Sequence, residues 1–285
     1  MAAQPETAEV FESSAPSESA ARDVAKRVLW RVLPGPMYRS LLARSRARDF
    51  TTGRFREPEM DLLEAAMRGG ESAVDVGANH GMWTAALSEA VGPTGRVYAF
   101  EPVPATYDVF RNVIRRLGLA NVEPIEKGCT DSPGWAELAV PAQPSGPSDD
   151  MQAHLAARAD GAGANGRTVR AEMVALDDHL PEEAEITFLK ADVEGAELFA
   201  LRGAAGLIER CRPTIVSEVD AGFLAGFGLS AGDLGGFLAE RGYETLHYRP
   251  EDRRLEPAGD LGRYGHGNLV FVHPARRERL DPFLP

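Results

Sequence analysis

The chain has 285 residues, of which 44% are hydrophobic, and its formal net charge is −12 at pH 7. That length and apolar content predict one large domain with appendages and a sizeable core. The negative charge argues against nucleic-acid binding through a global field, and no apolar run reaches the roughly 18 residues that a membrane span needs.

The number of cysteines and the composition of the N-terminal residues indicate the cellular compartment. The only cysteines are Cys129 and Cys211, and the chain has no C-x-x-C pair, which disfavours a structural zinc site or a disulfide scaffold. The first residues are acidic, rich in Ser, Ala and Pro, and without the apolar core of a signal peptide. We therefore expect a cytoplasmic protein.

The first 68 residues divide by composition into a tail and an arm. Residues 1–20 have little to bury, and we expect them to be disordered. Between residues 22 and 56 basic side chains dominate, and Asp23 and Asp49 are the only acids. Apolar spacing predicts a helix ending near Pro34, a short helix from Met37 and another over 59–67. We expect a basic helical arm over 21–68, which either packs with a solvated basic face or docks an acidic partner or substrate.

Residues 74–84 are the stretch around which the remaining chain is organised. An apolar run over 73–76 predicts a buried strand, Gly77 and Gly81 bracket a tight turn, and helical spacing begins at Met82. The turn reads D-x-G-x-x-x-G, which is neither the G-x-G-x-x-G of dinucleotide sites nor a phosphate-binding P-loop. Asp75 would repel a pyrophosphate, whereas it suits S-adenosylmethionine (SAM), which carries a sulfonium and an ammonium and no phosphate. Here glycine would leave room for the ligand to approach the backbone.

An acid follows the next predicted strand. Residues 96–100 are apolar or aromatic after Arg96, and Glu101 comes directly after them, one helix length beyond the glycine turn. A carboxylate at the end of a second parallel strand can accept hydrogen bonds from both ribose hydroxyls. Glu101 is therefore a predicted cofactor ligand.

Further elements alternate between strand and helix. We expect strands over 122–129, 134–140, 169–176, 186–189 and 214–216, helices over 107–117, 197–208 and 234–241, and an antiparallel pair of strands over 243–248 and 268–273. Residues 141–167 are rich in Ala, Gly and Pro and predict a flexible insertion, either a substrate lid or plain surface. The alternation predicts an α/β domain over 69–275 with a C-terminal tail over 276–285.

Polar residues gather where the predicted strands end. Lys190, Asp192 and Glu194 follow one strand, and Glu218 and Asp220 follow the next. In parallel sheets ligands bind outside the carboxyl ends of the strands, so we expect these side chains in one site. A helix beginning near Glu197 would by itself explain acids at this point, but it does not explain the lysine.

Several motifs together resemble a known family. V-D-V-G-A-N-H-G, A-F-E-P, A-L-D-D-H-L and F-L-K-A-D-V-E-G-A-E, with L-R-G-A following, are similar to the FkbM-type family of SAM-dependent methyltransferases over about two-thirds of the chain. The resemblance implies a class I (Rossmann-like) methyltransferase fold, with a mostly parallel seven-stranded sheet covered by helices on both faces. It also implies methyl transfer to a hydroxyl of a sugar or secondary metabolite, as in natural-product biosynthesis. The basic arm and the insertion depart from a minimal member and leave the substrate open.

The resemblance also assigns residues. It carries Asp75, Gly77, Asn79, Gly81 and Glu101 over as cofactor contacts, with His80 in the same turn. It carries Lys190, Asp192 and Glu194 over as the active-site signature.

An alkyl hydroxyl is a poor nucleophile, so a base is expected. Asp192 is the first candidate for base or orienting group, followed by Glu194 and Glu218, and Lys190 would pair with these acids or orient the acceptor. His80 is a weaker base candidate; His154 and His266 are given no role.

Two alternatives and two properties stay open. Asp192, Glu218 and Asp220 are hard oxygen ligands that could hold a magnesium ion, giving a metal-assisted reaction on the same substrates. A SAM-binding module without turnover is the non-enzyme alternative. The methyl acceptor, whether a small molecule or a glycan, and the oligomeric state, a homo-oligomer included, are not determined by the sequence.

Overall fold

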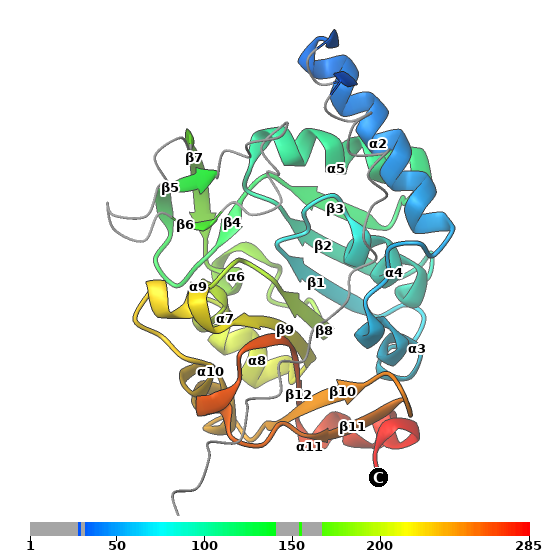
Figure 1. Cartoon of the computed structure of the whole chain (residues 1–285). Helices are drawn as coiled ribbons and strands as arrows, with labels where there is room; N and C mark the ends of the chain where they lie inside the picture. The colour runs from blue at the N-terminus through cyan, green and yellow to red at the C-terminus, as the bar shows by residue number, and fades with distance from the viewer. Residues whose placement is uncertain (1–27, 30–31, 141–153, 156–166) are drawn as a thin grey trace, which may run out of the picture.

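The computed structural model describes residues 28–29, 32–140, 154–155 and 167–285. Its centre is an eight-stranded sheet in the order β11-β10-β12-β9-β8-β1-β2-β3 (Figure 1). The parallel strands are β1 (Ser72–Val76), β2 (Arg96–Phe100), β3 (Val122–Ile125), β8 (Ile186–Ala191) and β9 (Thr214–Asp220). The antiparallel strands are β10 (Glu244–Arg249), β11 (Arg254–Pro257) and β12 (His266–Val272).

Helices cover both faces of this sheet because its strands are apolar on both sides. One face packs on α7 (Glu197–Arg202), α8 (Ala205–Cys211) and α10 (Ala231–Ala239), through alternate strand residues such as Val74, Leu189 and Ile215. The other face packs on η1 (Pro58–Leu62), α3 (Leu63–Ala66), α4 (Met82–Val91), α5 (Pro104–Leu117) and η4 (Glu278–Phe283). The polar residues described below belong to this second face.

A smaller sheet lies beside the central one (Figure 1). Its order is β4-β7-β5-β6, made of β4 (Gly128–Cys129), β5 (Gly134–Val140), β6 (His154–Leu155) and β7 (Arg167–Val174). The described residues leave out the 1–20 tail, most of the 141–167 insertion and most of the first predicted helix of the arm. They also leave out the side chain of His154.

The arm is mainly one helix, α2 (Gly35–Thr51). Pro34 stands at its N-cap. The described residues just before it, 28–29 and 32, are helical, so a helix ends near Pro34 as expected and a second one begins there. Its inner face buries Ala43 and Ala47 against Val109 and Val113 of α5. The segment expected as a third helix of the arm is η1 followed by α3, and its apolar side chains belong to the second face of the central sheet.

The structure corrects several expected elements. The sheet has eight strands where seven were expected, because β11 pairs with β10 as a hairpin. The strand expected over 122–129 is divided between the two sheets, and the one over 169–176 lies in the small sheet, with α6 (Leu176–His179) starting at its expected end. The helix expected over 197–208 is interrupted at Gly203, whose backbone lies against the Thr130 carbonyl.

Four short helical elements were not anticipated toward the C-terminal end. They are α9 (Ala221–Gly226), η3 (Leu261–Arg263), α11 (Pro274–Arg277) and η4 (Glu278–Phe283). Leu280 and Phe283 lie in the segment expected as a tail. They belong to η4 and are buried in the core on the second face of the central sheet. Within the described parts of the chain, no helix combines the length and the apolarity that crossing a membrane requires.

Candidate active site

Strand register places six polar residues on one face of the central sheet. Asp75 pairs with Lys190 and Lys190 with Val216, while across β9 and β12 Glu218 pairs with Asn268 and Asp220 with His266. Side chains alternate between faces along a strand, so residues two apart share a face with their register partners. Asp75, Lys190, Glu218, Asp220, Asn268 and His266 thus form one polar band near the carboxyl ends of the parallel strands.

The cofactor turn is held between β1 and β2. The backbone N–H groups of Gly77 and Ala78 both donate to the Phe100 carbonyl, at 3.0 and 2.8 Å. The Asn79 N–H donates to Glu101 Oε2 at 3.0 Å, and the Val103 N–H donates to Oε1 at 2.8 Å. These bonds fix the Glu101 carboxylate directly against the turn.

The two glycines of the turn are required by the protein itself. Gly77 has φ +82° and Gly81 has φ +94°, conformations that side chains with a Cβ rarely adopt. A Cβ on Gly77 would lie 1.8 Å from the Asp192 carbonyl oxygen, and one on Gly81 would lie 2.9 Å from the Phe110 ring. On the side of the turn where a Cβ would stand, protein atoms therefore occupy the space.

Asp75 is fully buried at the end of β1. Thr84 donates its hydroxyl to Asp75 Oδ2, which ties the start of α4 to the strand. Burial raises the pKa of Asp75 to about 7, although the Thr84 hydrogen bond and the Lys190 charge oppose the shift. His80, in the same turn, is also buried.

Lys190 is the buried cation of the band. Its side chain is 1% exposed, and its Nζ donates to Asn268 Oδ1 at 2.9 Å and lies 3.7 Å from Asp192 Oδ2. The Nζ also stands 5.4 Å from the centre of the Trp83 ring, a cation–π distance. Burial disfavours the charged form, yet surrounding carboxylates, Asp192 foremost, hold the pKa of Lys190 above its ordinary value.

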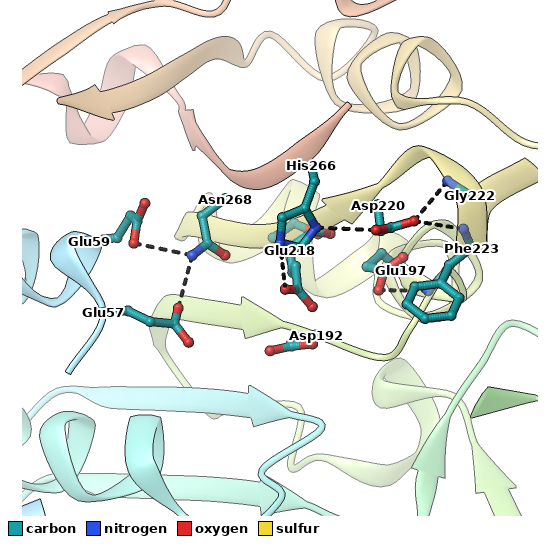
Figure 2. Close-up of polar contacts among 12 residues, drawn as sticks. Glu57, Glu59, Asp192, Glu197, Glu218, Asp220, Gly222, Phe223, His266 and Asn268 are labelled. Atoms are coloured by element: carbon teal, nitrogen blue, oxygen red, sulfur yellow. Dashed lines mark hydrogen bonds and ion pairs between the residues drawn. The ribbon is translucent and has the colours of Figure 1, made fainter. Parts of the chain in front are cut away.

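Two further acids reach this lysine through Asn268. Its amide nitrogen donates to Glu57 Oε2 at 2.9 Å and to Glu59 Oε2 at 3.1 Å (Figure 2). Glu57 also accepts the Trp83 indole N–H at 2.9 Å. Sequence reasoning missed these residues. An asparagine opening a buried apolar strand was the only local signal, and the glutamates lie more than 200 positions away from it.

Asp192 and its neighbours extend the band toward the loop after β8. The Asp192 N–H donates to the Val76 carbonyl at 3.0 Å, which continues the ladder between β1 and β8. Burial and the Asp192 charge raise the pKa of Glu218 well above its ordinary value. They also raise the pKa of Glu194 to about 8, and Glu194 itself has φ +54°. These shifts favour the protonated form of both glutamates.

Glu197 is the first residue of α7, and none of the described residues caps that helix with its side chain. The Glu197 Oε1 instead accepts the N–H groups of Val193 and Gly195, at 3.0 and 3.1 Å, and so holds the loop before the helix. Burial raises the pKa of Glu197 to about 7. The capping alternative is therefore wrong for the Glu197 side chain, although an acid does stand in the first turn of the helix.

Asp220 is shared between a helix and a histidine. Its Oδ1 caps α9 by accepting the N–H groups of Gly222 and Phe223, at 2.8 and 2.9 Å. Its Oδ2 lies 3.3 Å from His266 Nδ1, and His266 Nε2 lies 3.9 Å from Glu218 Oε1 (Figure 2). In the described part of the chain no three His, Cys, Asp or Glu side chains are arranged to hold a metal ion, the trio of Asp192, Glu218 and Asp220 included.

The mostly parallel sheet with helices on both faces is the expected class I methyltransferase fold, and comparison with known proteins gives the family. The model of the methyltransferase FkbM domain matches residues 75–245, which is more than half of the chain. The protein belongs to this family, as its motifs predicted.

Individual relatives are more distant. The chain is 37% identical over 62 residues to a protein-L-isoaspartate O-methyltransferase from Ignicoccus hospitalis, which covers 21% of this chain and 29% of that protein. A methyltransferase FkbM structure from Methylobacillus flagellatus KT is 22% identical, with a TM-score of 0.44, over 71% of this chain and 43% of that one. A SAM-dependent methyltransferase structure from Aquifex aeolicus is 16% identical, with a TM-score of 0.41, over 75% and 89%.

Proposed function

We propose that the protein is a SAM-dependent O-methyltransferase that acts on a hydroxyl of a sugar or secondary metabolite. The observation that carries the proposal is the contact between the cofactor turn and Asp192. The Asp192 backbone donates to Val76 and lies against Gly77, so a candidate base adjoins the turn expected to hold the methyl donor. Base and donor on adjacent strands satisfy the alignment that a displacement reaction requires.

The chemistry of the turn fits SAM better than a dinucleotide. The turn brings a carboxylate, Glu101, for the ribose hydroxyls, and Glu57 places negative charge beside Trp83 at the start of α4. Lys190, the cation of the polar band, is engaged by Asn268 and Asp192. A pyrophosphate would meet net repulsion here, whereas a sulfonium and an ammonium would be attracted.

The same charges bear on the acceptor. When bound, SAM supplies an electrophilic methyl group on a positively charged sulfur. Asp192 would accept the proton of the acceptor hydroxyl, and Lys190 would hold Asp192 in place through their 3.7 Å contact. The raised pKa values of Glu194 and Glu218 favour their protonated forms, which would donate hydrogen bonds to other acceptor oxygens. A carboxylate or phosphate beside the reacting hydroxyl would be repelled, so any acidic group of the acceptor would lie away from these acids.

Two experiments test this function in sequence. Titration calorimetry with S-adenosylhomocysteine is expected to show one site per chain, and binding of NAD with no response to the homocysteine compound would contradict the cofactor assignment. A mass-spectrometric screen of hydroxylated sugars and secondary metabolites with SAM is then expected to find a product heavier by one methyl group. Cofactor binding with no product from any acceptor would favour the binding module without turnover.

The exposed side of α2 is the place where an acidic partner or substrate would dock. Arg44 and Arg48 are exposed there, opposite the face that packs on α5, and their charge opposes that of the whole chain. Contacts of this kind weaken as salt rises. Replacing both arginines with serine is expected to remove the salt dependence of acceptor KM, whereas replacing the exposed Arg96 at the far end of β2 is not.

A further inference from the structure

His266 stands at the outer end of the polar band, on the edge that reaches solvent. Its side chain is 43% exposed, whereas Lys190 at the inner end is 1% exposed. Between them lie Asp192, directly after β8, and Glu218 on the neighbouring strand β9 (Figure 2). The Asp192 side chain is 29% exposed, and an acceptor seated on it would cover that surface, so the way out for its proton would then lie along this line.

The contacts of His266 orient the ring. Nδ1 lies 3.3 Å from Asp220 Oδ2, and Nε2 points to Glu218 Oε1 at 3.9 Å (Figure 2). Asp220 is itself fixed, because its other oxygen accepts two N–H groups of α9. A carboxylate facing Nδ1 favours the tautomer with the proton on Nδ1 and leaves Nε2 as the acceptor. The acceptor nitrogen thus faces the site.

Glu218 links the histidine to Asp192. Burial and the Asp192 charge raise the pKa of Glu218, which favours its protonated form. A protonated carboxyl between a carboxylate and a neutral imidazole can give its proton to one and take a proton from the other. The 3.9 Å separation from His266 exceeds a hydrogen bond, so transfer requires the Glu218 carboxyl to rotate toward the ring.

We propose that Glu218, His266 and Asp220 form the route by which the proton of the methyl acceptor leaves the site. The inference rests on the proposed O-methyl transfer. The acceptor O–H bond breaks and its electron pair forms the new bond to the methyl carbon, while the pair of the S–C bond stays on sulfur. The hydroxyl proton passes to Asp192. The proton of Glu218 passes to His266 Nε2, the Asp192 proton replaces it, and the imidazolium releases its proton to water.

The first test needs no acceptor. In protein labelled with ¹⁵N-histidine, the resonances that vanish in His266→Gln identify the ring. We expect the Nδ1–H tautomer in the wild type and the Nε2–H tautomer in Asp220→Asn. Asparagine still caps α9 through its oxygen, so this variant removes the charge beside the ring while keeping the fold. An Nε2–H tautomer in the wild type, or one unaffected by Asp220→Asn, would overturn the proposal.

The second test uses turnover with an acceptor from the screen. His266→Ala is expected to lower kcat on the order of tenfold to a hundredfold, with KM and S-adenosylhomocysteine affinity unchanged, and added imidazole is expected to restore the rate. His266→Gln, which fills the space, should not be rescued. A wild-type kcat in His266→Ala, or a loss that imidazole does not restore, would refute the route. If no acceptor is ever turned over, the proposed function fails, whereas the tautomer measurement still decides the role of Asp220.

Discussion

The backbone carbonyl oxygen of Asp192 lies 1.8 Å from where a Cβ on Gly77 would stand. The cofactor turn after β1 and the acidic loop after β8 are therefore in direct backbone contact. No side chain can be inserted between them without moving one loop. Because this contact involves only backbone atoms, the main chain sets the distance between the turn after β1 and the loop after β8.

Gly77→Ala is the corresponding prediction. The left-handed φ alone costs about 1–2 kcal/mol, and the clash with Asp192 adds to it, so we expect a larger loss of unfolding free energy and weakened S-adenosylhomocysteine binding. Gly118→Ala is the matched control, since Gly118 has φ +69° and nothing within 4 Å of its Cβ position. Urea denaturation and calorimetry measure both effects. Equal losses of stability in the two variants, with intact binding in Gly77→Ala, would contradict the role of the contact.

Glu101→Ala tests the cofactor carboxylate. Loss of charge-assisted bonds to a ribose is expected to cost about 1.5–3 kcal/mol of binding, roughly a tenfold to hundredfold weaker affinity for S-adenosylhomocysteine. Glu123→Ala is the control, because Glu123 lies on the next strand and pairs with the exposed Arg96. Calorimetry of both variants decides the matter. Unchanged affinity in Glu101→Ala would mean that the carboxylate serves only the backbone N–H groups of Asn79 and Val103.

The sequence predicted the parts of the site that are local in the chain. The strand, turn and acid of the cofactor site follow from short-range patterns, and so does the Lys190–Glu194 loop. Asn268 could not be placed, because its partner Lys190 depends on the register between β12 and β9. His266 was given no role because its pairing with Asp220 depends on β12 lying antiparallel to β9 in this register. Strand β11 was missed because its short sequence has no periodic pattern of its own. Only its pairing with the neighbouring strand β10 defines it.

The buried acids give a pH dependence of stability. The pKa of Asp75 is about 7 in the folded protein, above its ordinary value, so between about pH 4 and 7 the folded state binds more protons than the unfolded state. Stability from this group is full at low pH and declines as pH rises through that window. Asp75→Asn is expected to flatten the fall in urea midpoint between pH 5 and 8. Glu194 and Glu197 have raised pKa values too, so some slope should persist.

The control for this effect is Asp131→Asn, since Asp131 is exposed on a turn. It should follow the wild-type curve. If Asp75→Asn also follows that curve, Asp75 is ionised in the folded protein at the low end of the window, and the nearby Lys190 charge outweighs its burial.

Asp192→Asn separates a base from a metal ligand. The substitution preserves size and removes charge and basicity. With Asp192 as the base, S-adenosylhomocysteine affinity stays near the wild-type value, whereas kcat falls by roughly a hundredfold or more, and the wild-type enzyme keeps its activity after exhaustive chelation. Loss of wild-type activity on chelation, restored by magnesium, would instead assign Asp192 with Glu218 or Asp220 to a metal. Near-normal kcat in Asp192→Asn would show that catalysis rests on positioning or on Glu194 or Glu218. We expect the first outcome, because Asp192 alone among these acids is joined both to the cofactor strand through Val76 and to the buried Lys190.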